Sequence, residues 1–271
     1  MKREDLIVHR NYCKSLCLLG ILSVSLFCNV LLTDAVIDSN TVAVWLFEEG
    51  GGKVVRDASG NGHDGEIIGN LNSVRGKFGK GLDFPGDGSG YIVVDSTKKL
   101  ELETLSIEAW VNVKNSTGKW QGIVCKQQAG CTNRNYGIWV NINLHVLHAQ
   151  IGANGGCAFN MNGTTEITDN VWHHLAFTFD GKVGKVYVDG ELETEKDNTN
   201  TFQSNDPITI GVPNIGNAGG LLGTIDEIRI SNVARTEKEI NEMKDVGLAQ
   251  ILSVNPSEKL TTRWGYIKQA P

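Results

Sequence analysis

Apolar and polar residues alternate with a period of two along most of the chain after residue 35. The segment 105–113, LSIEAWVNV, is the clearest case, and its apolar residues share one face: Ile107, Ala109, Val111 and Val113. Further alternating segments lie between short clusters of Gly, Asn and Asp: YGIWVNI, LHVLHAQIG, HHLAFTFD, KVYVDGEL, ITIGV and GTIDEIRI. Short alternating runs between such turns are typical of antiparallel strands with one buried face. The pattern predicts an all-β fold, an antiparallel β-sandwich.

One segment near the C-terminus follows a helical pattern instead. Thr236 followed by Glu239 forms a capping box, in which each side chain bonds to the backbone of the other residue. Ile240 and Met243 fall on one helical face, and Gly247 suits a helix end. We therefore predict one short C-terminal helix. Residues 248–271 have no clear period and are interpreted as a tail.

The first 35 residues differ from the rest of the chain. Several basic residues precede an uncharged apolar run over 16–32, and small residues follow at Thr33 and Ala35. This order is that of a secretory signal peptide, so we predict that 1–35 is removed after Ala35. The alternative is an uncleaved anchor, because the run is long for a signal core and short for a membrane-spanning helix. With cleavage, we expect a protein that is secreted or at the cell surface, without a stable membrane span.

Charge and glycine content narrow the function classes. The chain has 25 basic and 31 acidic residues, a formal net charge of −6, and no basic cluster. Nucleic-acid binding is therefore not expected, because it requires a basic surface. The 32 glycines, set against 5 prolines, fit many tight turns between short strands.

Three cysteines lie beyond the predicted signal peptide: Cys125, Cys131 and Cys157. An odd number in an oxidising compartment predicts one bridge and one remaining thiol. If the segments NYGIWVN and LHVLHAQIG form a hairpin, the loops that carry Cys131 and Cys157 emerge at the same end of the sandwich. We predict a disulfide between these two and a buried thiol at Cys125, which lies within the strand GIVCK.

Five segments resemble, in their order along the chain, the LamG-like jelly-roll domains of the concanavalin A-like lectin/glucanase superfamily: AVWLFEEGGGKVVRDASGNGHDG, GKGLDFPGDGSGYIVV, LSIEAWVNV, VWHHLAFTFDGKVGKVYVDGE and GTIDEIRISNVARTEKEI. The resemblance covers about residues 41–245, so 36–247 is expected to be one such domain. It implies two curved antiparallel sheets packed face to face, often one structural calcium ion, and use as an extracellular recognition module. Residues 114–165 match no family pattern, and we expect ligand specificity there.

Two adjacent histidines, His173 and His174, raise the question of a metal or proton-transfer site. Neighbouring residues on a strand point to opposite faces, so the pair cannot hold one metal ion as two histidines on a helix can. In the resembling family this segment is structural. We interpret both histidines as part of the wall of the sandwich.

Three function classes remain open. The leading one is a non-catalytic binding module, with a carbohydrate or an extracellular glycoprotein as its partner. Sugar rings stack on flat aromatic faces, and the aromatic residues in or beside the unmatched segment are Trp120, Tyr136 and Trp139. These three are the candidate ligand-binding residues, and ordinary strand packing is the alternative for each. A purely structural or adhesive domain is another class.

The remaining class is a glycoside hydrolase. The segment ELETEKD places Glu191, Glu193 and Glu195 on one face of an alternating strand, about 6.6–6.8 Å apart per step. Retaining glycosidases hold two carboxyl groups roughly 5–5.5 Å apart, which long side chains could reach. The run follows an Asp-Gly turn, however, and charges commonly protect such hairpin edges. We therefore predict no catalytic residues.

A calcium site is the last candidate. The glycine-rich loop RDASGNGHDG carries Asp57 and Asn61, and calcium binds mixtures of carboxylate, amide and carbonyl oxygens. In the resembling family the first and last strands are neighbours, which implies that Asp226 approaches this loop. The predicted structural Ca²⁺ ligands are Asp57, Asn61 and Asp226, with Glu48 as a further possibility. The alternative is a turn that Asp and Asn side chains cap through their own backbone bonds.

Overall fold

The computed structural model describes residues 38–127, 134–152, 159–198, 204–217, 219–248 and 250. The predicted signal peptide, the predicted Cys131–Cys157 bridge and nearly all of the predicted tail lie outside these ranges. Among the described residues, no helix is long and apolar enough to cross a membrane.

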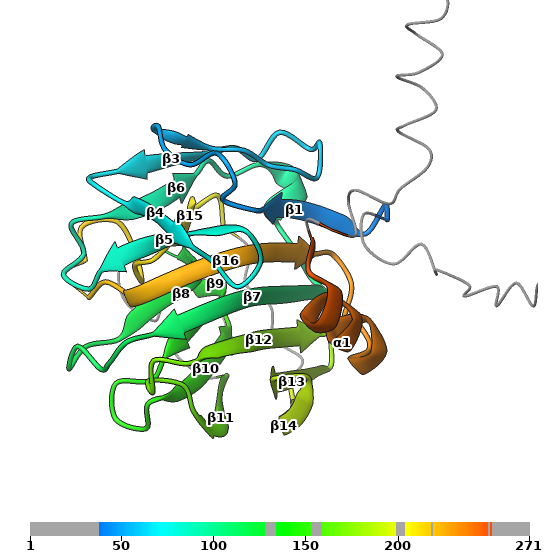
Figure 1. The fold of residues 1–271 in the computed structure, drawn as a ribbon. Helices are drawn as coiled ribbons and strands as arrows, with labels where there is room; N and C mark the ends of the chain where they lie inside the picture. The colour runs from blue at the N-terminus through cyan, green and yellow to red at the C-terminus, as the bar shows by residue number, and fades with distance from the viewer. Residues whose placement is uncertain are drawn as a thin grey trace, which may run out of the picture. The chain divides into compact units, whose positions relative to one another are not determined.

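Eight strands form a first sheet, called sheet A here (Figure 1). They are β1 Thr41–Trp45, β4 Asn72–Arg75, β5 Lys80–Pro85, β7 Leu105–Val113, β12 Trp172–Phe179, β13 Val183–Val188, β14 Glu191–Asp197 and β16 Leu222–Ser231. Their order in space is β14-β13-β12-β7-β16-β5-β4, and β1 also pairs with β16. All of these pairings are antiparallel.

A second sheet, sheet B, also has eight strands and lies behind the first in Figure 1. They are β2 Val54–Val55, β3 Gly65–Ile68, β6 Tyr91–Val94, β8 Gln121–Gln127, β9 Arg134–Val140, β10 Val146–Ile151, β11 Asn160–Glu166 and β15 Ile208–Ile210. Their order in space is β11-β10-β9-β8-β15-β6-β3-β2, again antiparallel. The predicted hairpin of β9 and β10 is confirmed.

The core lies between the two sheets. All four apolar residues predicted to share a face of β7 belong to it. Alternate residues of β12 and β9 belong to it as well: Leu175, Phe177, Phe179, Tyr136, Ile138 and Val140. Because every second side chain of these strands points inward, each sheet buries one face against the other. The predicted antiparallel β-sandwich is confirmed.

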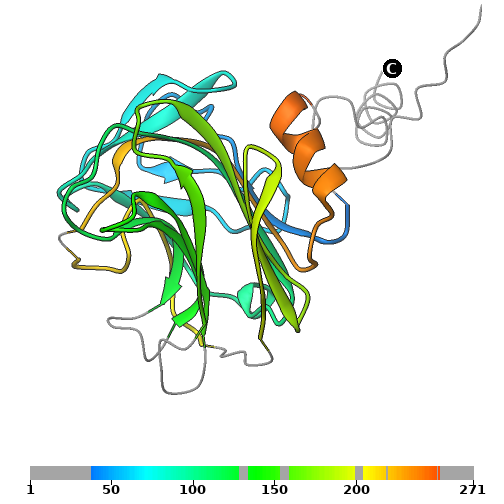
Figure 2. The same cartoon turned by 90° about the horizontal axis from the view of Figure 1, so that it is seen from below.

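The predicted C-terminal helix is confirmed as α1, Glu237–Val246. The Thr236 hydroxyl accepts a hydrogen bond from the Glu239 backbone, and the Glu239 carboxylate accepts one from the Thr236 backbone. Gly247 follows the last turn, and Ile240 and Met243 are buried. Figure 2 shows α1 against the outer side of sheet A.

A buried ion pair lies on this outer face of sheet A. Glu108 of β7 and Arg229 of β16 are opposite one another in the ladder, and Arg229 donates to both carboxylate oxygens, at 2.6 and 2.9 Å. Both side chains are fully buried. The next residues along the same row, Ala176 and Tyr187, pack against Ile240 of the helix. The helix therefore helps to exclude water from the charges.

Arg235 connects the beginning and the end of the described fold. Its guanidinium pairs with Asp38, ahead of β1, at 2.7 Å and with Glu239 of α1 at 2.8 Å. The Arg235 side chain is 1% exposed, so most of this contact is shielded from water. The first strand and the helix are thus held at one point.

Candidate functional site

The outer face of sheet B gathers polar and aromatic side chains from residues 114–165, the segment in which the sequence led us to expect ligand specificity. The alternate residues of β9 and β10 that fill the core are Tyr136, Ile138, Val140, Leu147, Ala149 and Ile151. Trp139, His148 and Gln150 lie between them in the sequence and therefore point to the opposite face. The strand alternation thus places an indole, an imidazole and an amide on one surface.

Ring contacts join part of this surface into a row. The Trp120 ring lies 4.7 Å from the His148 ring, and His148 lies 5.9 Å from Trp139. At the other end of the row, the Arg134 guanidinium lies 5.0 Å from the centre of the Trp139 ring. Trp120 is 36% exposed, whereas Trp139 is 1% exposed. Within this row, the Trp120 ring is therefore accessible to solvent, whereas the Trp139 ring is buried.

Five side-chain atoms in this region are buried and have no hydrogen-bond partner among the described residues: Gln127 Oε1, Arg134 Nε, Asn135 Oδ1, Trp139 Nε1 and Gln150 Nε2. We refer to these five residues, together with Trp120 and His148, as the outer-face cluster. A buried polar group without a partner costs roughly 1–3 kcal/mol, and native proteins contain few of them. The arrangement suits a ligand that both donates and accepts hydrogen bonds, because the unpaired atoms include both kinds.

Other polar atoms of four of these side chains form hydrogen bonds within the protein. Gln127 Nε2 donates to the Pro213 carbonyl at 2.7 Å, and Asn135 Nδ2 donates to the Ser204 carbonyl at 3.2 Å. Arg134 Nη1 donates to Gln150 Oε1. Because one end of each group is fixed, the unpaired end has a defined position before any ligand arrives.

The three predicted ligand-binding aromatics have different positions in the fold. Trp120 is exposed, and Trp139 lies on the same face but is buried. Tyr136 faces the core, its hydroxyl donates to the Leu100 carbonyl at 2.9 Å, and burial raises the pKa of its phenol. Tyr136 is therefore a packing residue, and its assignment as a ligand contact needs correction. The sequence reasoning missed Arg134 and Gln150, which only the pairing of β9 with β10 brings to this surface.

Cys125 lies beneath the outer-face cluster. It is a free cysteine and fully buried, as predicted, and burial raises the pKa of its thiol. It stands opposite Gly137 in the ladder of β8 and β9, and its sulfur lies 3.7 Å from the Ile138 carbonyl oxygen. A buried thiol with a raised pKa is a poor nucleophile, so we assign it a packing role.

The two histidines occupy opposite faces of β12, as the alternation predicts. His174 is fully buried on the outer side beside Trp110, with ring centres 5.3 Å apart, and burial lowers its pKa to about 3. His173 bonds to Asp189 at 2.8 Å and to Asp169 at 3.2 Å, and the Asp189 bond raises the pKa of His173. The pair does not converge on one point.

Two of the three glutamates of β14, Glu193 and Glu195, have structural partners. A bulge between Val186 and Tyr187 shifts the pairing of β13 with β14, so the simple alternation assumed for Glu191, Glu193 and Glu195 is wrong. The Glu193 carboxylate accepts hydrogen bonds from two backbone N–H groups and one hydroxyl of β11. Glu195 pairs with Lys185 at 3.0 Å. This geometry does not support a pair of catalytic carboxylates on β14.

In the glycine-rich loop after β2, the Asp57 carboxylate accepts hydrogen bonds from the protein at both oxygens. Asp57 Oδ1 accepts hydrogen bonds from the backbone of Val44 and Ser59, and Oδ2 accepts them from the Ser59 hydroxyl and the His63 backbone. These bonds outweigh the effect of burial and hold the pKa of Asp57 below its usual range. Asn61 Oδ1 accepts from Lys99 Nζ at 2.7 Å. The oxygens expected to bind calcium are therefore engaged by the protein.

Asp226 lies in a different setting, beside the turn between β4 and β5. Its Oδ2 accepts a hydrogen bond from the Phe78 backbone at 2.8 Å, and its buried Oδ1 has no hydrogen-bond partner within the described ranges. Burial, together with the charges of Glu227 and Glu48, raises the pKa of Asp226 to about 8. Among the described residues, no hydrogen bond joins Asp226 to Asp57 or Asn61, because each side chain bonds to other residues. The expected set of Asp57, Asn61 and Asp226 is thus not joined by these contacts, and it stays a prediction.

Glycines of this turn leave room for two carboxylates. A methyl group at Gly79 would lie 1.9 Å from Glu48 Oε1, and one at Gly76 would lie 2.4 Å from Asp226 Oδ2. The unpaired Asp226 oxygen and the nearby Glu48 charge suit a cation. Three or more His, Cys, Asp or Glu side chains do not gather as a metal site anywhere in the described ranges. A calcium ion here would therefore also need carbonyl oxygens or water.

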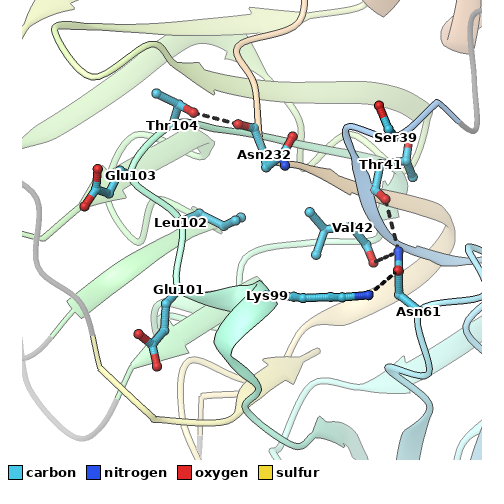
Figure 3. Close-up of a pocket in the computed structure, with 10 residues that line it drawn as sticks. All are labelled: Ser39, Thr41, Val42, Asn61, Lys99, Glu101, Leu102, Glu103, Thr104 and Asn232. Atoms are coloured by element: carbon cyan, nitrogen blue, oxygen red, sulfur yellow. Dashed lines mark hydrogen bonds between the residues drawn. The ribbon is translucent and has the colours of Figure 1, made fainter.

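A separate pocket of about 470 Å³ lies beside β1 and the short 3₁₀ helix η2, Lys98–Leu100 (Figure 3). Asn61 bridges its rim, donating to the Thr41 and Val42 carbonyls and accepting from Lys99. The residues that line it, all of them described, have no buried side-chain polar atom without a partner. Because its polar groups satisfy one another, this pocket is a weaker candidate than the outer-face cluster.

Several solved structures share the fold. The binding domain of Paraclostridial Mosquitocidal Protein 1 matches with a TM-score of 0.65 and 16% identity, over 77% of this chain and 52% of that one. Domain 4 of AbnA, a GH43 extracellular arabinanase from Geobacillus stearothermophilus, matches with a TM-score of 0.60 and 22% identity, over 76% and 98%. Trypanosoma rangeli sialidase matches with a TM-score of 0.59 and 19% identity, over 76% and 33%. The chain thus spans about half of the toxin domain and a third of the sialidase.

The sequence itself matches a family profile. No curated protein matches the sequence as a relative. The profile described as the concanavalin A-like lectin/glucanases superfamily matches residues 86–241, more than half of the chain. The matched range includes β7, β12 and β16, whose segments carry the resemblance seen in the sequence. The chain therefore belongs to the concanavalin A-like lectin/glucanase superfamily.

Proposed function

We propose that this domain is a non-catalytic carbohydrate-binding module and that it binds its ligand at the outer-face cluster of sheet B. The observation that carries the proposal is the group of five buried, unpartnered polar atoms beside the exposed ring of Trp120. Sugars present many hydroxyl groups, each a donor and an acceptor, around a ring with apolar faces. Such a ligand would pair the unpartnered atoms and stack on the indole.

Proteins of the same fold support a carbohydrate-binding role. Domain 4 of the arabinanase AbnA was solved in complex with arabinotriose, and the mosquitocidal-protein domain is described as a binding domain. The carbohydrate could be free or carried by an extracellular glycoprotein. Export is part of the proposal and rests on the charged and apolar pattern of residues 1–35.

A glycan array tests the proposal directly. Wild-type protein is expected to bind one class of saccharide, and Trp120→Ala is expected to weaken binding about tenfold or more, because an aromatic contact residue commonly contributes over 1.4 kcal/mol. Leu192→Ala removes an exposed apolar side chain of sheet A, 43% exposed, and serves as the matched control. If binding survives in Trp120→Ala and is lost in Lys99→Ala, the pocket beside β1 is the site instead.

A structural calcium ion is a second part of the proposal. The residues that fit it are Asp226 and Glu48, because each carboxylate accepts a hydrogen bond from the backbone of the turn between β4 and β5. The ion would neutralise two neighbouring carboxylates and fix this turn on sheet A. Binding to the folded state alone would stabilise it by about 2.7 kcal/mol at a hundredfold excess over Kd.

Thermal unfolding in millimolar calcium and in chelator tests the ion. Wild type should unfold at a higher temperature in calcium, and Asp226→Asn should lose this difference. Asp57→Asn is the comparison variant, because the oxygens of Asp57 are already engaged. A calcium response lost only in Asp57→Asn would move the ion to the first loop, and no response in wild type would exclude the site.

A further inference from the structure

The charge of Arg134 has no carboxylate partner within the described part of the chain. Its interactions there are the hydrogen bond to Gln150 Oε1 and the contact with the Trp139 ring. The segments that follow β8 and β10, QAGCTN at 128–133 and ANGGCA at 153–158, contain no Asp or Glu. Among the described residues, no acidic side chain therefore contacts the Arg134 guanidinium to neutralise its charge.

Other arginines of the fold show what is usual for this protein. Arg229 is fully buried and pairs with Glu108 through two hydrogen bonds. Arg235 is almost fully buried and pairs with Asp38 and Glu239. Arg134 differs from both, since its neighbours are an amide and an aromatic ring.

Burial makes this position costly for a charge. Loss of solvent lowers the pKa of Arg134, and the Nε atom lacks a hydrogen-bond partner. An anion beside the guanidinium would offset the desolvation and accept the unused N–H group. The planar guanidinium presents parallel donors that match a carboxylate or a sulfate.

We infer that the saccharide bound at the outer-face cluster is acidic, and that Arg134 binds its carboxylate or sulfate group while Trp120 stacks on a sugar ring. The inference rests on the proposed function and specifies its ligand class. Arg134 and Trp120 stand at opposite ends of the row through His148 and Trp139, so an oligosaccharide can contact both. The unpartnered amide atoms of Gln127, Asn135 and Gln150 would then bind hydroxyl groups.

Binding to matched pairs of saccharides tests the inference by calorimetry. The pairs are sialyllactose with lactose, trigalacturonic acid with its methyl ester, and a sulfated chondroitin tetrasaccharide with its unsulfated form. We expect the acidic member of at least one pair to bind about tenfold or more tightly, since a hydrogen bond to a charged group commonly contributes that much. The pairs distinguish carboxylate from sulfate as the group recognised.

Variants of Arg134 then assign the preference to this residue. Arg134→Gln should remove the preference for the acidic member and keep the affinity for the neutral one. Arg134→Lys retains a charge without the planar donor pair, so it should keep a reduced preference, and it serves if the Gln variant does not fold. Lys119→Gln, beside Trp120, removes an exposed charge and should leave the preference unchanged.

The results separate the inference from the proposed function. Equal binding of acidic and neutral members would overturn the acidic ligand while leaving a carbohydrate module in place. A preference that persists in Arg134→Gln would also overturn it. Failure to bind any saccharide on an array that includes these pairs would overturn both.

Discussion

Breaking the buried ion pair of Glu108 and Arg229 measures how much stability the fold loses when a charge beneath α1 is left unpaired. The substitution Glu108→Gln keeps the size of the side chain and removes its negative charge. Arg229 then remains charged and fully buried, and its Nη1 atom already lacks a hydrogen-bond partner. His174 nearby is neutral above about pH 3 and cannot replace the lost charge.

The expected loss of stability is large. Removing one member of a buried ion pair commonly costs about 3–5 kcal/mol, because the other charge stays buried and unpaired. In a domain of this size each kcal/mol lowers Tm by roughly 2–4 °C, so Glu108→Gln should unfold on the order of 10 °C below wild type. The double variant Glu108→Gln/Arg229→Met removes both charges and should recover most of this loss.

Calorimetry of the wild type, both single variants and the double variant forms a double-mutant cycle. The reasoning predicts a coupling of several kcal/mol and a double variant more stable than Glu108→Gln. A single variant within about 1 kcal/mol of wild type would show that water reaches Arg229, and the account of the helix as a cover would then be wrong. Lys185→Met, which breaks the exposed pair with Glu195, is the control and should cost less than about 1 kcal/mol.

Three further predictions concern hydrolytic activity, the pH dependence of stability and cysteine pairing. Assays on β-glucans, galactans and chitin-like substrates should show no hydrolysis, and activity lost specifically in Glu193→Gln would contradict the non-catalytic proposal. The raised pKa of His173 means that its charged form stabilises the fold fully below about pH 6.5, and that this stabilisation is lost as pH rises through the folded pKa; His173→Gln should remove this dependence from thermal unfolding curves. Non-reducing peptide mapping should yield a bridge between Cys131 and Cys157, and a bridged peptide containing Cys125 would contradict it.

The fold could be predicted from the alternation of apolar and polar residues because the apolar positions are the ones that the structure buries. Along β7 every second residue is apolar, and all of these residues enter the core. The helix was equally readable, since the capping box and Gly247 act within a few residues of one another. Such signals depend only on residues that are close together in the chain, so they can be recognised in a single sequence.

The site depends on contacts that a single sequence does not display. Both faces of β9 carry an aromatic residue, so the alternation alone could not tell that Tyr136 enters the core and Trp139 leaves it. Arg134 and Gln150 meet through the pairing of β9 and β10. Asp57 and Asp226 were expected to meet because two strands are neighbours, but each side chain turns to partners of its own. A bulge in the pairing of β13 with β14 likewise changed which residues of β14 share a face.

The contacts of Arg235 have a consequence for how the molecule opens. Because one guanidinium binds both the segment ahead of β1 and the first turn of α1, separation of either one leaves the buried charge of Arg235 with one carboxylate partner instead of two. The beginning and the end of the domain should therefore fray as one cooperative unit, and their amide hydrogens should exchange at similar free energies of opening. A protease that acts on transiently opened chain would then find both ends protected together, and Arg235→Ala would expose them separately.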